Sequence, residues 1–568
     1  MAASSLQPRA ADAAPAPAPR AAWRAPWRLG SWAIAAIVAA PVLGVLANLA
    51  APGGGALAHL AATTLPGIVA DTLALAAIVG VATAVVGVAC AWLVTMCRFP
   101  GSRALEWALL LPMAMPAYIV AYAYADFLAF AGPLQTALRE ATGWRRGAYW
   151  FPDIHSVGGA GAVFALVLYP YVFMLARAAF LEQSVCVLEA SRMLGARAWR
   201  GFALVALPLA RPAIAAGVAL ALMETLADFG AVQHFGIQTF TTAIYRTWYG
   251  MGDRVAAAQL SAMLLLAVLA LLLLERASRG AARVHGAARR QGAIRPHALA
   301  GWRATAAFLA CALPVLLGFV LPVAILLRLH LAAGEAIDAR LFAGLAANSL
   351  AIAGLAALAT TAAALVLGYG LRRARDRWTR AAIRFATMGY AIPGTVIAVG
   401  VVAWLGRFDN ALDGWARTAL GVPLGLLLSG SILALLFAHV VRFLSVAASA
   451  VDSGLGRITP SMDDAARTLG AAPARVLARV HAPMMRGSVL VAVVLVFVDV
   501  LKELPATLLV RPFNFDTLAV HVHALASDER LAQAAAPALA IVLAGLAPVA
   551  ILAAMIRRGR AGGGAGEA

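Results

Sequence analysis

Two polar stretches decide how this sequence folds: Glu189–Pro208, EASRMLGARAWRGFALVALP, and Asp463–Pro483, DDAARTLGAAPARVLARVHAP. They share one frame, in which an acidic residue and small residues precede a Gly, and a Pro follows that Gly. Because Gly commonly ends a helix, each stretch predicts a short polar helix that stops at Gly195 or Gly470. Long apolar runs flank both stretches, so we expect these helices to lie between buried segments.

The apolar runs place the chain in a membrane. Of 568 residues, 63% are apolar and 12% are charged, and the mean hydropathy is +0.85. This composition excludes a soluble enzyme and a disordered chain. A helical span needs about 20 apolar residues, and we expect an all-α, polytopic helical membrane protein with about 12 transmembrane helices. The expected spans are 31–50, 71–95, 105–130, 158–180, 212–233, 254–275, 304–327, 345–371, 383–405, 423–444, 488–508 and 534–556.

Arginine sets the expected orientation. The segments on the side of the N-terminus hold 30 of the 44 Arg residues, and positive charge accumulates on the cytoplasmic side. We therefore expect a multi-pass protein in the lipid bilayer with both termini cytoplasmic. The basic connector 276–303 is explained by this rule, so we expect no nucleic acid partner. The polar helices around Gly195 and Gly470 then lie in the cytoplasm, where an exposed face can dock a partner, and the chain is expected to re-enter the membrane after Pro208 and Pro483.

The chain is also an internal duplication. Pro116 matches Pro393 at an offset of 277, and Gly195, Pro208, Phe240, Thr242 and Asp253 match residues 275 positions later. Six spans in each half predict two parallel repeats related by an axis along the membrane normal. The expected segments are a disordered tail 1–30, a first repeat 31–275 with loop 181–211, the connector 276–303, a second repeat 304–556 with loop 445–487, and a cytoplasmic tail 557–568.

The sequence contains no phosphate-binding loop of the Walker A type. Such a loop needs a Lys after its Gly-rich turn, and Lys502 is the only Lys in the chain. We therefore expect no ATPase site, no covalent chemistry and no bound cofactor in this chain. If ATP drives its activity, another polypeptide uses it.

The two polar stretches resemble the EAA motif of permeases of ABC importers. In that family the loop forms a coupling helix that sits in a groove of a cytoplasmic ATPase. The chain departs from the motif at Ser191, Val205, Val480, Asp464 and Ala482. The resemblance assigns ATPase coupling to Glu189, Ala190, Ser191, Gly195, Leu207 and Pro208 in the first half, and to Asp464, Ala465, Ala466, Gly470 and Pro483 in the second.

Three further stretches, 111–139, 224–253 and 499–532, are similar to ferric-iron ABC permeases with two fused repeats. The resemblance implies a permease of the bacterial inner membrane that moves ferric iron inward by alternating access. It also implies two copies of a cytoplasmic ABC ATPase and a periplasmic solute-binding protein as partners. Thiamine, a polyamine, sulfate or phosphonate are alternative cargoes of the same class, and a secondary transporter driven by an ion gradient is a further alternative.

Charged residues within spans are costly and mark candidate transport pathways. Glu224 and Asp228 lie four residues apart, which predicts one shared helix face, and Asp499 and Glu503 are their counterparts in the second half. With Lys502, these four acids carry a formal charge of −3, which suits a cation. Alternatively, the acids pair with Arg residues or cap helix ends and only stabilise packing.

Tyr118, Tyr122 and Asp126 follow one another at intervals of four in the third span. Their oxygen atoms would suit a hard cation, although Tyr near a membrane surface is often an anchor. Six histidines are expected in outer loops, where polar surface is the simpler interpretation and metal capture the alternative: His59, His155, His234, His330, His521 and His523. The sequence thus assigns no metal site firmly.

Overall fold

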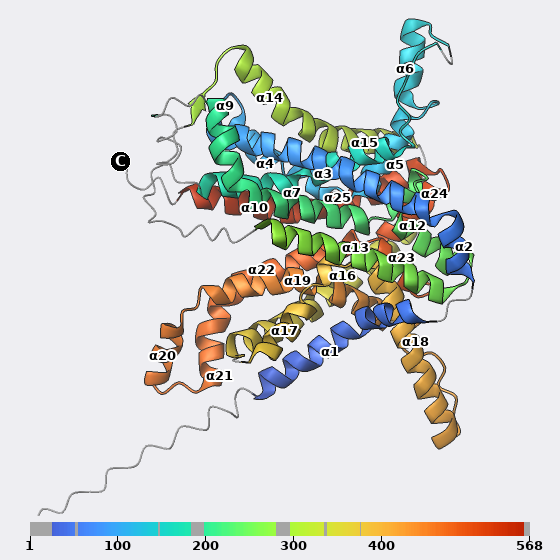
Figure 1. The fold of residues 1–568 in the computed structure, drawn as a ribbon, viewed down its shortest axis with the longest axis vertical. Coiled ribbons are helices and arrows are strands. Elements are labelled where there is room, and N and C mark those ends of the chain that lie inside the picture. Colours follow the sequence, from blue (N-terminus) through green and yellow to red (C-terminus); the bar gives the residue numbers. More distant parts are fainter. Residues whose placement is uncertain are drawn as a thin grey trace, which may run out of the picture.

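The computed structural model confirms an all-α membrane protein (Figure 1). It describes residues 25–51, 55–145, 148–182, 193, 198–279, 296–333, 338–374 and 376–561. Within these residues, 12 helices are long and apolar enough to cross a membrane, one for each expected span. The strands of this part of the chain are β1 (Cys97–Arg98) and β2 (His297–Ala298), which pair in parallel.

The first half contains, in chain order, α1 (Ala25–Ala47), η1 (Asn48–Ala50), α2 (Ala56–Thr63), α3 (Leu65–Met96), α4 (Ser102–Ala108), η2 (Leu111–Ala114), α5 (Ala117–Leu128), α6 (Pro133–Thr142), α7 (Val157–Glu182), α9 (Ala198–Gly201), the π-helical turn η3 (Phe202–Ala206), α10 (Leu207–Ala227), α11 (Gly230–His234), α12 (Phe240–Tyr245), the π-helical turn η4 (Arg246–Gly250) and α13 (Arg254–Arg279).

The second half contains α14 (Trp302–Val315), the π-helical turn η5 (Leu316–Val320), α15 (Leu321–Ala332), α16 (Ala339–Arg373), α17 (Arg377–Ala386), η6 (Gly389–Ala391), α18 (Gly394–Ala419), α19 (Ile432–Gly456), α20 (Pro460–Thr468), α21 (Pro473–Val476), the π-helical turn η7 (Leu477–His481), α22 (Ala482–Leu501), α23 (Pro505–Val510), α24 (Leu518–Ser527) and α25 (Leu531–Ala561).

The elements of the two halves correspond at the offsets seen in the sequence. A shift of 275 residues aligns α9 with α21 and η3 with η7 residue for residue. The same shift aligns the start of α10 with the start of α22, and the C-terminal ends of these two helices differ by one residue. In Figure 1, α9, α20 and α21 lie at one end of the bundle, whereas α2, α6 and the far end of α18 lie at the opposite end. The duplication therefore yields two bundles with the same orientation.

The first membrane-spanning helix of each half packs against helices of the other half. α1 of the first half packs on α16, α17 and α18 of the second half. In return, α15 of the second half packs on α5 of the first and on α25. The halves are thus held together by exchanged helices as well as by their facing surfaces.

Prolines interrupt the third span of each half. The expected spans 105–130 and 383–405 break at Pro116 and Pro393, and the residues just before these prolines, Met115 and Ile392, have an extended backbone. A Pro lacks the N–H that a helix would use and restricts the residue before it. The broken segments place irregular backbone, including η2 and η6, inside the protein.

Close packing of α3, α7 and α10 depends on two glycines. A Cβ at Gly217 would lie 2.7 Å from the Cα of Val172, and a Cβ at Gly87 would lie 2.7 Å from the Cβ of the same residue. Small residues allow helix backbones to approach in this way within membranes. The backbone contact leaves little room for adjustment.

We predict that Gly217→Ala lowers the stability of the folded protein by about 1–3 kcal/mol because the added methyl group overlaps α7. Gly344→Ala is the matched control, since nothing lies within 4 Å of its Cβ position in α16. The control should be neutral or stabilising, because Ala is the better helix former. Thermal unfolding in detergent measures both effects, and equal melting temperatures for the two variants would contradict the prediction.

Candidate functional site: a charged cavity between the two halves

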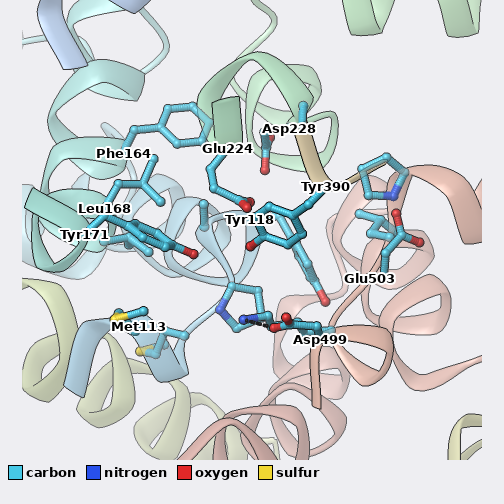
Figure 2. A pocket seen from close by; sticks show the side chains of 18 of the residues that line it. Met113, Tyr118, Phe164, Leu168, Tyr171, Glu224, Asp228, Tyr390, Asp499 and Glu503 are labelled. Atoms are coloured by element: carbon cyan, nitrogen blue, oxygen red, sulfur yellow. Dashed lines mark ion pairs between the residues drawn. The ribbon is translucent and has the colours of Figure 1, made fainter. Parts of the chain in front are cut away.

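A cavity with about 750 Å³ of empty space, including its opening, lies between the two halves. Residues of η2, α5, α7 and α10 line it from the first half, and residues of η6, α19, α22 and the segment after α22 line it from the second. Figure 2 shows carboxylates and phenol rings arranged around this space. All four acids assigned to the pathway from the sequence line the cavity: Glu224, Asp228, Asp499 and Glu503.

Two of these acids cap short helices. Helix α10 ends at Ala227, and the Asp228 carboxylate accepts a hydrogen bond of 2.9 Å from the backbone N–H of Ala231 in α11. Helix α22 ends at Leu501, and the Glu503 carboxylate accepts hydrogen bonds from the N–H groups of Ala506 and Thr507 in α23, both 2.9 Å long. Asp228 and Glu503 therefore cap helix ends, which was the alternative role considered for these acids. Both residues nevertheless line the cavity.

Glu224 and Asp499 lie one turn earlier, within α10 and α22. The Asp499 carboxylate forms an ion pair of 2.9 Å with the ammonium of Lys502. Glu224 lies close to Tyr390, which lines the same cavity. The expected single helix face for Glu224 and Asp228 is wrong, because α10 stops between them and Asp228 has an extended backbone. The two side chains reach the same cavity from different backbone conformations.

Sequence reasoning missed several residues that line the cavity. Arg442 falls near the end of the expected span 423–444 and was not assigned to the pathway, but it lines the cavity and lies 3.5 Å from Glu503. Its charge changes the expected sum of −3 to a formal −2 for four carboxylates and two cations. Tyr171 and Tyr390 also line the space. A charged Arg inside an apolar run was the one signal that could have identified Arg442.

The expected row of Tyr118, Tyr122 and Asp126 does not form one site. Tyr118 lines the cavity, and its buried hydroxyl has no hydrogen-bond partner within the described residues. The Tyr122 hydroxyl instead forms a hydrogen bond of 2.7 Å with Nδ1 of His523. Asp126 is half-buried near Arg328 of α15. Each oxygen therefore faces a different environment.

His155 lies in a loop as expected, but the other five histidines lie in helices. His59 lies in α2, His234 in α11, His330 in α15, and His521 and His523 in α24. The rings of Tyr122 and His234 pack edge to face, with their centroids 4.6 Å apart. Burial lowers the pKa of both His234 and His523 to about 4, so both are neutral near pH 7. Among the described residues, no three His, Cys, Asp or Glu side chains are close enough to hold a metal ion.

The coupling residues assigned by the motif lie on and after α20 in the second half. Asp464 and Ala465 are exposed on α20, and Gly470 follows this helix with φ of +76°. Pro483 and Leu207–Pro208 lie inside helices that continue into the bundle as α22 and α10. The π-helical turns η3 and η7 come just before these prolines. Glu189, Ala190, Ser191 and Gly195 lie outside the described residues.

A polar network that the motif did not predict anchors α20. The Asp463 carboxylate accepts a hydrogen bond of 3.0 Å from Arg372 at the end of α16, and its other oxygen lies 2.6 Å from Nε2 of His481. Nδ1 of His481 lies 2.9 Å from the hydroxyl of Tyr369. Burial alone would raise the pKa of the Asp463 carboxyl, but its bonds to His481 and Arg372 outweigh burial and hold that pKa below its ordinary value. The network ties α20 to α16 and to the helix that continues into α22.

We predict that Asp463→Asn loosens α20, because the neutral amide loses the ion pair. Amide hydrogen exchange in α20 should become about fivefold faster, corresponding to about 1 kcal/mol for a partly exposed pair. A lowered pKa in the folded state means that this stabilisation is present above the ordinary value of about 4 and is lost as pH falls below it. Exchange in α20 should therefore be protected at pH 6 in the wild type and not in the variant.

Asp452→Asn is the matched control, because Asp452 is exposed on the neighbouring α19. Equal exchange rates in α20 for wild type, variant and control would show that the network does not hold this helix.

The comparisons with known proteins agree with this architecture. Residues 83–283 match the family model described as a binding-protein-dependent transport system inner membrane component. The chain is 25% identical to the Fe(3+)-transport system permease protein FbpB 2 of Haemophilus influenzae, over 85% of this chain and 89% of that protein.

Two further relatives match a shorter part of the chain. The molybdenum transport system permease protein ModB of Escherichia coli is 30% identical over 34% of this chain and 84% of its own length. The sulfate transport system permease protein CysT of Escherichia coli is 30% identical over 28% of this chain and 55% of that protein. With 12 apolar helices among its described residues, arranged in two repeats, the chain belongs to the binding-protein-dependent transport system inner membrane components and is a multi-pass permease of the ABC importer class.

Proposed function

We propose that this chain carries both permease halves of an ABC importer for ferric iron and moves the ion from the periplasm to the cytoplasm. The observation that carries the proposal is the pairwise repetition of carboxylates around the central cavity, Glu224 with Asp499 and Asp228 with Glu503. Their formal excess over Lys502 and Arg442 favours a cationic cargo. Carboxylate and phenol oxygens are ligands that suit a hard cation, and the relative FbpB 2 is named for Fe(3+) transport.

The proposed partners supply energy and cargo. Two copies of a cytoplasmic ABC ATPase dock at the loops 181–211 and 445–487, and a periplasmic solute-binding protein delivers the ion at the opposite end. ATP is used by the partner, and this chain contributes neither an ATPase site nor a bound cofactor. Both termini lie in the cytoplasm in this arrangement, because the first and last spans begin and end at the side of the docking loops.

Continuous helices link docking to the cavity. The second docking segment leads at Ala474 into a helix that runs without interruption to Leu501. Asp499 therefore lies about 38 Å along this helix from Ala474, at 1.5 Å per residue. A displacement of α20 by the ATPase would move this helix as a rod and shift Asp499 relative to the other half. Alternating access then follows from the rocking of one repeat against the other.

An oxyanion is the second candidate cargo, and two observations favour it. Lys502 and Arg442 place two cations in the cavity, and ModB and CysT are named for molybdenum and sulfate transport. Uptake measurements distinguish the two cargoes, because they require opposite responses to the loss of cavity acids.

We predict ATP-dependent uptake of radioactive ferric iron into proteoliposomes that contain the chain, the partner ATPase and the binding protein. Glu224→Gln should reduce uptake by tenfold or more, since one carboxylate of the path loses its charge, while assembly with the ATPase is retained. Asp153→Asn, at an exposed loop position, is the matched control. Uptake of molybdate or sulfate without uptake of iron would replace the iron proposal, and iron uptake without any ATPase would indicate a gradient-driven transporter.

We also predict that Gly470→Val uncouples ATP hydrolysis from uptake. Gly470 has φ of +76°, a conformation that β-branched residues avoid, so the turn after α20 must change. Because the Cβ position at Gly470 contacts nothing within 4 Å, folding of the bundle should be preserved. The ratio of iron transported to ATP hydrolysed should fall at least tenfold. An unchanged ratio would remove the coupling role from this turn.

A further inference from the structure

The acids of the cavity are repeated in both halves, but its bases are not. At the repeat offset of 275, Lys502 corresponds to Ala227 and Arg442 corresponds to Val167. Ala227 and Val167 also line the cavity, so each pair of equivalent positions faces the same space. The second half therefore brings both positive charges to a cavity whose negative charges come equally from both halves.

The two bases have different surroundings. The Arg442 guanidinium lies 3.5 Å from Glu503, two of its nitrogens have no hydrogen-bond partner within the described residues, and a Cβ at Gly394 would overlap it. The Lys502 ammonium contacts Asp499 through one ion pair, and the two side chains are 29% and 17% exposed. Lys502 is the one Lys among 45 basic residues. A compact ammonium on a flexible stem can leave such a contact, whereas a planar guanidinium fits a fixed one.

Polar groups around Lys502 are suited to a second cation. Glu224 and the phenol of Tyr171 lie within electrostatic range of the Lys502 ammonium. Tyr390 lies close to both Glu224 and Asp499. Tyr118 is 4% exposed and lines the same cavity, and its hydroxyl has no hydrogen-bond partner in the described part of the chain. A buried hydroxyl without a partner is energetically costly, so a ligand that contacts it is bound more favourably.

We propose that the Lys502 ammonium is a resident counter-ion, which Asp499 holds between transport events and which the cargo cation displaces. The cation then contacts Asp499 and Glu224, the two repeat-related carboxylates, with neighbouring phenol oxygens. This inference rests on the proposed function only in taking the cargo to be a cation. When Lys502 moves away, the formal charge around the cargo changes from −2 to −3, which balances a trivalent ion. Competition from such a counter-ion also keeps the binding of the cargo cation weak enough for the cation to leave the site, as transport requires.

The test is a binding titration of the full-length permease in lipid nanodiscs, with no ATPase present. Tb³⁺ is the probe, because tyrosines near the site can sensitise its luminescence. Lys502→Met should bind Tb³⁺ at least tenfold more tightly than wild type, since the competing ammonium is gone. Lys502→Arg keeps the positive charge in a group that is harder to displace, so it should bind Tb³⁺ no more tightly than wild type. Glu224→Gln in the Lys502→Met background should reverse the gain in affinity.

Arg417→Met is the matched control, because it removes one positive charge from an exposed ion pair with Asp413 outside the cavity. It should leave Tb³⁺ affinity unchanged. Equal affinity for wild type and Lys502→Met, or equal tightening by Lys502→Met and Lys502→Arg, would overturn the proposal. Weaker Tb³⁺ binding by Lys502→Met together with loss of molybdate binding would also overturn it and identify Lys502 as an anion ligand.

The titration separates this inference from the proposed function. Failure of ATP-driven iron uptake together with the predicted Tb³⁺ affinities would overturn the cargo and leave the counter-ion role in place. Iron uptake by the wild type with unchanged Tb³⁺ affinity in Lys502→Met would overturn the counter-ion role alone. Size-exclusion profiles of the nanodiscs show whether each variant is folded, and Lys502→Arg supplies the charge-retaining variant for comparison.

Discussion

The carboxylates of Asp228 and Glu503 cap short helices at two breaks in the bundle, and the architecture of the cavity depends on these contacts. Backbone N–H groups inside a membrane protein must find partners within the protein, and α11 and α23 begin where α10 and α22 have just ended. A carboxylate meets this need with charge-assisted hydrogen bonds. The same contact introduces negative charge into the interface between the halves. The helix breaks and the anionic character of the cavity therefore have one physical cause.

Duplication explains what the halves share, and later divergence explains how they differ. The caps and the acids one turn before them recur in both halves, whereas Lys502 and Arg442 occur in the second half alone. The contacts at the end of the bundle that carries α9 and α20 differ in the same manner. Tyr369 joins a polar network that reaches α20, but its counterpart Trp92 packs against Phe202 with ring centroids 4.7 Å apart. The second half thus holds α20 by directional bonds and brings both positive charges to the cavity.

Much of the fold could be predicted because hydropathy and duplication are properties of the sequence itself. The spans follow from apolar length, and the acids of the cavity follow from the cost of charge inside a membrane. The rest depends on contacts between distant residues. Arg372 and Asp463 are 91 positions apart, and the motif directed attention to Asp464 instead. The regular spacing of Tyr118, Tyr122 and Asp126 suggested one site, but the neighbours of each side chain come from other helices.

The central claim is that a cation crosses between the repeats at the level of Glu224 and Asp499. The most direct measurement is an anomalous diffraction map, recorded at the iron absorption edge, from crystals of the permease soaked with ferric ion. The account predicts a peak in the central cavity between these two carboxylates, with Lys502 turned away from Asp499. A peak confined to the outer surface, or an oxyanion bound between Lys502 and Arg442 in place of iron, would contradict it.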